Sequence, residues 1–246
     1  MILTSKLVYD FYRKMDLIRN AEQAEIPLVD VIAYLNDFQQ ILFNNDVKEA
    51  ERNQEVANAL RKFKKDRTPL TLNKVGSEVL AVYPQDFHTR LNQLATVTSK
   101  TCCEGMTKKI GGKFKVLQSD DINAAVENPL QRSSFFFERL ISVVSSEGLR
   151  IFPGEMEIKE VVIDYYRKPL DLHNPSNERC GGQYYYVATG EIIVEDTNCE
   201  FENYGDGFIS DGAVLLATAD KIKDPNGFNI KLQKLLQSRS LTSVRD

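Results

Sequence analysis

Hydrophobic positions in the first part of the chain recur at intervals of three and four residues, the period of an amphipathic helix. The apolar residues between Leu7 and Ile18 follow this spacing, and those between Leu28 and Leu42 repeat it after Pro27. We therefore expect two helices. The second should begin near Pro27, whose missing N–H would be unpaired in a first helical turn anyway.

A third helix is expected after Asn44-Asn45, which should end the second one. Asp46 and Glu49 have the spacing of an acidic capping box, in which each side chain satisfies a free N–H of the first turn. This helix would run into the basic stretch at 61–67 and stop before Pro69.

From residue 70 onward, short apolar runs stand between glycines and prolines, which is typical of strands and turns. We expect a strand at 77–83 and a short helix at 119–127. Residues 108–117 read as a hairpin that turns on Gly111-Gly112, because paired glycines supply the positive φ angles of a tight turn.

Three strand signals follow in quick succession, at 140–145, 149–152 and 159–166, and the turn Pro153-Gly154 separates the last two. This spacing favours an antiparallel meander. The next segment, 168–183, is a long polar loop, and loops of this length usually carry a function or bind something.

The last third predicts a second hairpin at 184–194, a helix at 208–222 and a weaker helix at 229–236. The aromatic runs Phe135–Phe137 and Tyr184–Tyr186 break strict alternation. Consecutive aromatic residues in a strand place large apolar groups on both faces. The second face could be covered by a partner or by the rest of the same chain.

These elements predict an α+β fold with antiparallel N-terminal helices and a central antiparallel β-rich region of hairpins or a meander. A C-terminal helix should pack back on the helical part. The expected boundaries are 1–68, 69–203 and 204–246, joined in one integrated domain. A chain of 246 residues is long enough for one large domain or two small ones.

The composition, 42% hydrophobic and 27% charged, is that of an ordinary globular protein. The net charge of −4 argues against a dedicated nucleic-acid binder, which would carry a basic excess. No segment approaches the ~20 apolar residues of a membrane-spanning helix, and the first residues do not resemble a signal peptide. Four cysteines do not form a disulfide framework in a chain of this size, so we expect synthesis in a reducing cytoplasm.

Residue chemistry predicts no catalytic, cofactor or metal site. The cysteines lack the Cys-x-x-Cys spacing of zinc sites: they are Cys102, Cys103, Cys180 and Cys199. The two histidines lie on unrelated segments, and the glycines form no phosphate loop. A Cys–His or Ser–His pair assembled in space is the remaining route to a nucleophile.

Charge is segregated along the chain. Seven acidic residues and no basic ones lie at 191–211, whereas basic residues gather at 61–67 and 108–115. The acidic segment could be a solvated face, a cation site or a surface for a basic neighbour. Charges held apart in this way also suit head-to-tail contacts between copies, which close into a ring when the rotation permits.

The candidate interface residues are taken from these charged segments and from the long loop and the tyrosine run beside them. They are Arg61, Lys62, Lys64, Lys65, Arg167, Lys168, Asp171, Tyr185, Glu195, Asp196, Glu200 and Glu202.

A longer pattern runs from Tyr83 to Pro169. It opens with Tyr83-Pro84-Gln85-Asp86-Phe87, continues through Phe114 to Ile122 and Asn128-Pro129, and closes on Val162 to Pro169 after Leu149 to Pro153. This order resembles the virion structural proteins of crAss-like and related Bacteroidetes-infecting tailed phages, the ring or "stabilisation" proteins of the neck.

The resemblance implies a structural head-to-tail connector in the virion, with no catalytic residues, no cofactor and no membrane contact. It implies a ring of twelve subunits that joins the portal to other neck and tail ring proteins. Packaged DNA would pass through its channel without sequence-specific binding. Two alternatives stay open: a nucleic-acid-binding accessory protein that uses 61–67 and 108–115, and an enzyme with an acidic site around 195–206.

Overall fold

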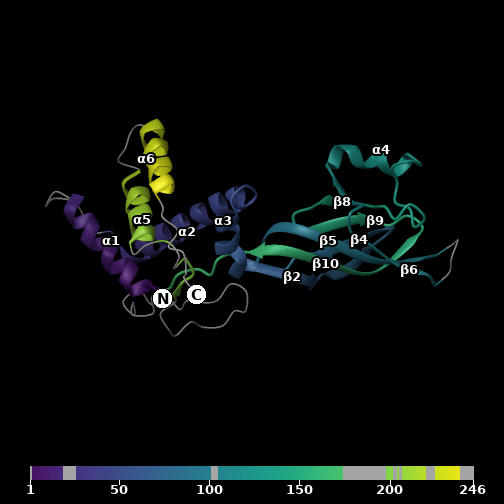
Figure 1. Cartoon of the computed structure of the whole chain (residues 1–246), viewed down its shortest axis with the longest axis horizontal. Helices are drawn as coiled ribbons and strands as arrows, with labels where there is room; N and C mark the ends of the chain where they lie inside the picture. Colours follow the sequence, from purple (N-terminus) through teal and green to yellow (C-terminus); the bar gives the residue numbers. More distant parts are fainter. Residues whose placement is uncertain are drawn as a thin grey trace. The chain divides into compact units, whose positions relative to one another are not determined.

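The computed structural model confirms the mixed α+β class, with helices at both ends of the chain and antiparallel sheets between them (Figure 1). The structure describes residues 2–18, 26–100, 105–173, 198–201, 204, 207–219 and 225–238. The chain divides into two compact units. We call residues 1–62 with 169–246 the helical unit, and residues 63–168 the β unit.

The helical unit is built from segments at the two ends of the chain. Its helices are α1 (Thr4–Ile18), α2 (Leu28–Ala50), α3 (Gln54–Ala59), α5 (Phe208–Ala219) and α6 (Pro225–Ser238), and the 3-10 turn η1 (Leu60–Phe63) leads toward the β unit. The short strand β1 (Ile2–Leu3) pairs antiparallel with β11 (Asn198–Cys199).

Helix α5 packs against both α1 and α2, as expected for a C-terminal helix that returns to the helical part (Figure 1). The contact with α2 is very close at Gly212, where an added Cβ would lie 2.2 Å from the ring of Phe38. Phe38 is fully buried. A side chain of any size at position 212 would therefore push α5 away from α2.

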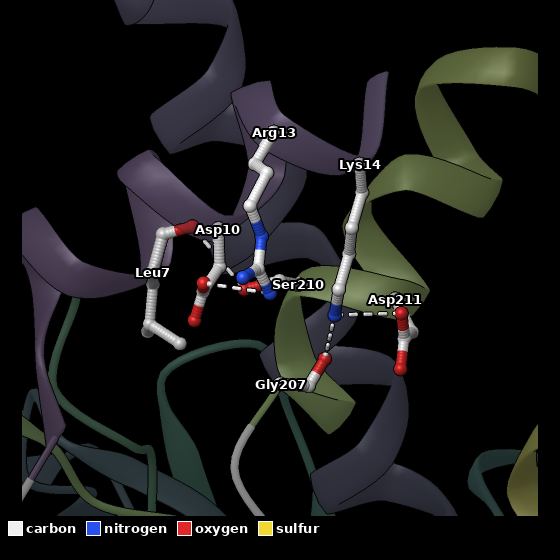
Figure 2. Close-up of polar contacts among 7 residues, drawn as sticks. All are labelled: Leu7, Asp10, Arg13, Lys14, Gly207, Ser210 and Asp211. Atoms are coloured by element: carbon white, nitrogen blue, oxygen red, sulfur yellow. Dashed lines mark hydrogen bonds and ion pairs between the residues drawn. The ribbon is translucent and has the colours of Figure 1, made fainter. Parts of the chain in front are cut away.

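Polar side chains reinforce the contact between α1 and α5 (Figure 2). Lys14 Nζ lies 2.6 Å from the carboxylate of Asp211 and donates to the carbonyl oxygen of Gly207 at 2.8 Å. The buried hydroxyl of Ser210 donates to the carbonyl oxygen of Leu7 at 3.1 Å. These two backbone-directed bonds join residues 193 and 203 positions apart in the sequence.

The structure corrects the expected end of the second helix. Helix α2 continues through Asn44-Asn45 to Ala50. Asp46 does not cap a new helix: it is buried on α2 and accepts a hydrogen bond from the hydroxyl of Tyr204. The N-cap of α3 is Asn53, whose side-chain oxygen accepts the N–H of Glu55.

The β unit consists of two sheets. The four-stranded sheet has the order β2 (Lys64–Pro69), β10 (Met156–Arg167), β5 (Phe87–Ser99), β6 (Thr107–Ile110). The five-stranded sheet has the order β3 (Thr71–Val75), β4 (Glu78–Val82), β9 (Gly148–Phe152), β8 (Leu140–Val144), β7 (Phe114–Leu117). The connection after β7 holds the 3-10 turn η2 (Ser119–Asp121) and α4 (Ile122–Glu127).

Both sheets contribute to one hydrophobic core, so the unit is a sandwich. Ala95 and Val97 reach it from β5, and Leu149 and Ile151 reach it from β9. The chain passes from the first sheet to the second at Leu70, whose N–H donates to Val161. The strand expected at 77–83 is confirmed as β4, and the short helix expected at 119–127 as η2 and α4.

Two expectations about this part of the chain are wrong. The helix predicted to run through 61–67 ends at η1, and β2 begins at Lys64, because these polar residues pair with the long central strand β10. The hairpin predicted at 108–117 does not form either. Gly111-Gly112 instead carries the chain from β6 in one sheet to β7 in the other, where β7 pairs parallel with β8.

The meander is also only partly right. Strands β8 and β9 form the expected antiparallel pair, and the chain turns at Pro153-Gly154 as predicted, with Gly154 at a φ of 60°. Strand β10 then pairs with β5 and β2 rather than with β9. The turn therefore changes sheets instead of extending one.

Candidate interaction surfaces

The structure brings four of the candidate basic residues to one end of the β2–β10 ladder. Lys64 and Lys65 lie opposite Tyr166 and Tyr165 on β10, which ends at Arg167, and Lys168 follows it in the chain. The guanidinium group of Arg167 lies 5.3 Å from the ring centroid of Phe63. Arg61 and Lys62 precede this cluster in the chain and belong to the helical unit.

Carboxylates interrupt this basic cluster. Lys64 Nζ lies 2.8 Å from Asp66, and this hydrogen bond raises the pKa of Lys64 above its ordinary value. The backbone N–H of Arg67 donates to Asp164 at 2.7 Å. The end of the ladder therefore carries charges of both signs rather than an uninterrupted basic stripe.

The two ends of the Tyr83–Pro169 pattern meet in space. The rings of Tyr83 and Phe87 stack with their centroids 3.8 Å apart, and Phe87 lies against Tyr165 at 5.6 Å. The hydroxyl of Tyr165 donates to Asp86 at 2.8 Å, and the backbone N–H of Lys168 donates to the carbonyl oxygen of Asp86 at 2.7 Å. These residues hold the end of β10 against the start of β5.

Burial raises the pKa of Tyr165 above its ordinary value, and the hydrogen bond and charge of Asp86 raise it further. His88 lies in the same region, where burial lowers its pKa and the positive charge of Lys168 lowers it further. Neutral forms of both side chains are favoured. Neutral side chains are what we expect at the partly buried end of the β5–β10 strand pair.

The first part of the long loop is held against α2. Gln39 donates to the carbonyl oxygen of Leu170 at 2.8 Å, and the N–H of Leu172 donates to Asn36 at 2.7 Å. The N–H of Leu170 also donates to the carboxylate of Glu200 at 2.7 Å. The structure thus brings the candidate residue Glu200 next to the segment that holds exposed Asp171.

The other acidic and aromatic candidates, Tyr185, Glu195, Asp196 and Glu202, lie outside the described residues, as do the predicted hairpin at 184–194, Cys102 and Cys103.

A different surface stands out on the β unit. Residues 134–139 form a tight turn closed by a bridge between Ser134 and Arg139, and we call this turn the aromatic loop. Phe136 is 82% exposed and Phe137 is 54% exposed, while nearby Leu130 is 78% exposed. The run Phe135–Phe137 is therefore not a strand, and Phe136 and Phe137 point toward solvent instead of toward a second core.

The aromatic loop is braced from several sides. The guanidinium group of Arg139 lies over the ring of Phe137 at 5.7 Å and donates to the carbonyl oxygen of Leu130. Lys113 donates to the carbonyl oxygen of Phe137 at 3.3 Å. Lys108 pairs with Glu138 at 3.1 Å. The exposed rings thus belong to an ordered turn.

Two hollows flank this loop. One, of about 300 Å³, is lined by Phe137 together with Val126, Arg132 and Phe152. The other, of about 360 Å³, lies between α4 and the five-stranded sheet and is lined by Lys115, Gln131 and Arg139, among others. Within the described part of the chain, the buried Nε of Arg139 has no hydrogen-bond partner.

The run of three phenylalanines is visible in the sequence, but its interpretation as part of a strand was wrong. The signal that points to a turn is local: Ser133-Ser134 before the run and Glu138-Arg139 after it leave no alternation of polar and apolar residues. Glu138 has a φ of 54°, which no periodicity could indicate.

The two units carry charges of opposite sign. The β unit has 16 basic and 13 acidic residues, a net charge of +3, whereas the helical unit has 15 basic and 22 acidic residues, a net charge of −7. The acidic segment 191–211 lies in the helical unit, and the basic clusters lie in the β unit except for Arg61 and Lys62.

Among the described residues, no three His, Cys, Asp or Glu side chains are arranged to hold a metal ion. In the same part of the chain, no helix is both long and apolar enough to cross a membrane.

Comparison with models of known protein families gave no match, and comparison with the curated proteins gave none either. The interpretation of these surfaces therefore rests on their residues and geometry.

Proposed function

We propose that this chain is a non-catalytic, ring-forming structural subunit of a tailed-phage neck. In this role it joins the portal to the tail, together with other ring proteins, and surrounds the channel through which packaged DNA passes. The function belongs to the assembled virion, and the subunit acts by packing against copies of itself and its neighbours.

The aromatic loop is the observation that carries this proposal. Leaving a phenylalanine side chain in water instead of burying it forgoes about 1.5–3 kcal/mol. Here Phe136 and Phe137 stay exposed although Arg139 and Lys113 hold their turn in place. An ordered apolar protrusion of this kind is typical of a surface that meets another protein.

The contacts within the Tyr83–Pro169 pattern also support the proposal. Asp86 and Tyr165, from opposite ends of the pattern, bond to each other and secure two central strands. The pattern that resembles the neck proteins thus consists of residues with a structural role. The basic residues give less support to a nucleic-acid-binding protein, because Lys64 and Lys108 have carboxylate partners within the chain.

Mass photometry and negative-stain microscopy of the purified chain, alone and with the portal protein of the same phage, test the proposal. We expect rings, or rings on the portal, and their loss when Phe136 and Phe137 are both changed to serine. The matched control is Val75→Ser, which removes an apolar side chain that is 58% exposed on β3.

A chain that stays monomeric at all concentrations and never joins the portal would contradict the proposal. If that monomer also bound DNA with an affinity that falls steeply with salt, the nucleic-acid-binding alternative would replace it.

A further inference from the structure

The aromatic loop lies in a basic setting on the β unit. Arg139 is the last residue of the loop, and Lys113 donates to the carbonyl oxygen of Phe137. Arg132 lines the hollow beside Phe137 together with Glu155, and Lys115 lines the hollow beside Arg139. Glu138 belongs to the loop but is paired with Lys108. We call Lys113, Lys115, Arg132 and Arg139 the basic rim.

The hollow of about 360 Å³ has the donors that a carboxylate needs. Its lining includes Lys115, Gln131 and Arg139, and the Nε of Arg139 has no hydrogen-bond partner within the described residues. Arginine and lysine bind carboxylates through charge-assisted hydrogen bonds, which are roughly twice as strong as neutral ones. Asp121 also lines this hollow and adds one negative charge to it.

We propose that the aromatic loop and the basic rim dock on the acidic helical unit of a second copy of this chain. Phe136 and Phe137 form the apolar centre of the contact, and carboxylates of the neighbouring copy meet the rim. Charge complementarity supports this occupant, because the β unit carries +3 and the helical unit −7.

The contact joins two different surfaces, so it is heterologous and propagates from copy to copy. A rotation that closes on itself gives a ring. This inference rests on the proposed function, because it names the surfaces by which the proposed ring would close.

A zero-length carbodiimide cross-link between amines and carboxylates locates the contact. Equal amounts of unlabelled and ¹⁵N-labelled full-length chain are assembled and cross-linked, and the peptides are identified by mass spectrometry. We expect mixed-isotope links from Lys113 or Lys115 to carboxylates at 1–62 or 169–246. The inference would be wrong if an oligomer formed but Lys113 and Lys115 gave no cross-links between copies, or gave cross-links only to carboxylates of the β unit.

Charge reversal supplies a second measurement. Changing Lys115 and Arg132 to glutamate should weaken self-association at least tenfold, and added salt should weaken the wild-type contact. Lys74→Glu is the matched control, because Lys74 is exposed on β3 and lies outside the basic rim. Its assembly should equal that of the wild type.

The outcomes separate the two proposals. A wild-type chain that does not assemble contradicts the ring function and this contact together. If the wild-type chain assembles and the Lys115→Glu, Arg132→Glu variant assembles equally strongly, the ring function stays in place and the proposed docking surface is wrong.

Discussion

The helical unit and the β unit reach a packed core by different means. The β unit is one continuous stretch, 63–168, in which the long strands β5 and β10 pair along most of their length. The helical unit is discontinuous, and its second part comes from residues after 168. Its segments are joined by specific side-chain hydrogen bonds, such as those from Ser210 to the carbonyl oxygen of Leu7 on α1 and from Tyr204 to Asp46 on α2.

This difference indicates where each unit is vulnerable. Strand pairing tolerates many side chains, because the backbone makes the bonds, but it does not tolerate a displaced backbone. Helix packing tolerates small movements of the backbone but depends on the shape of each contact. Substitutions should therefore affect one unit and spare the other.

Matched glycine substitutions should have the largest effects. An added Cβ at Gly148 would lie 2.0 Å from the carbonyl oxygen of Ala81, and one at Gly212 would lie 2.2 Å from the ring of Phe38. We expect Gly148→Ala to destabilise the β unit, and Gly212→Ala the helical unit, each by about 3 kcal/mol. Calorimetry of the full chain, with hydrogen exchange to assign each transition, measures both.

Gly112→Ala is the control for this pair, because no atom lies within 4 Å of its added Cβ. Both transitions should stay at their wild-type temperatures. If either alanine at 148 or 212 lowered both transitions equally, the two units would not be independent in stability.

Two tyrosine hydroxyls allow a finer comparison. Tyr204 donates to Asp46, which is 1% exposed, whereas Tyr165 donates to Asp86, which is partly exposed. Tyr204→Phe leaves a buried carboxyl with one partner fewer, so we expect it to cost about 2 kcal/mol in the helical unit. Tyr165→Phe should cost about 1 kcal/mol in the β unit. Urea titrations followed by hydrogen exchange measure both losses in free energy of unfolding. A larger loss for Tyr165→Phe than for Tyr204→Phe would contradict this expectation.

The β unit should also be sensitive to alkali. Burial, followed by the bond to Asp86, raises the pKa of Tyr165 above the ordinary 10.0, and burial raises the pKa of Tyr83 and Tyr166 too. Above about pH 10 the unfolded chain loses these protons while the folded chain keeps them. The contribution of these three tyrosines to the free energy of unfolding is therefore constant below about pH 10 and falls as the pH rises above it.

Tyr165→Phe should make this alkaline decline shallower without abolishing it, because Tyr83 and Tyr166 remain. Tyr9→Phe is the control, since Tyr9 is 67% exposed on α1. Unfolding of the β unit measured from about pH 8 to about pH 11 gives both slopes. Equal slopes for Tyr165→Phe and the wild type would contradict the expectation.

The smallest effect is expected for Lys14→Met. Lys14 joins α1 to Asp211 and to the carbonyl oxygen of Gly207 on the α5 side, but the side chain of Asp211 is 51% exposed (Figure 2). We expect a loss of about 0.5–1 kcal/mol in the helical unit that shrinks at high salt. Lys159→Met removes a pair with Glu157 on one strand of the β unit and should change nothing measurable.

The spacing of apolar residues predicted those helices and strands whose apolar residues are continuous or lie along one face. The stripes of α1 and of most of α2, and the apolar runs of β8 and β9, are local signals that survive in the structure. The strand β5 was not predicted, because threonine, asparagine and glutamine interrupt its apolar positions. The strand β2 is polar and exposed over most of its length, so nothing in its own residues distinguishes it from a helix end.

Partner choice was the part that local patterns could not supply. Whether Gly111-Gly112 forms a hairpin or a crossing depends on β5 and β8, which flank it in space and not in sequence. Asp46 looked like a cap because its partner, Tyr204, lies 158 positions away. The turn of the aromatic loop has local signals in the flanking residues, but its brace from Lys113 comes from a segment 24 residues earlier and could not be predicted from them.

The discontinuity of the helical unit has a consequence for how the chain is made. Helices α1 and α2 leave the ribosome well before α5, which covers them and ends at Ala219. At about 5–20 residues per second, the intervening chain takes roughly 8–30 s to synthesise. During that interval the apolar faces of the first two helices have no α5 to cover them, while the β unit is synthesised between them and α5. Nascent chains therefore pass through a stage in which a chaperone, or a neighbouring nascent chain, can occupy the place of α5.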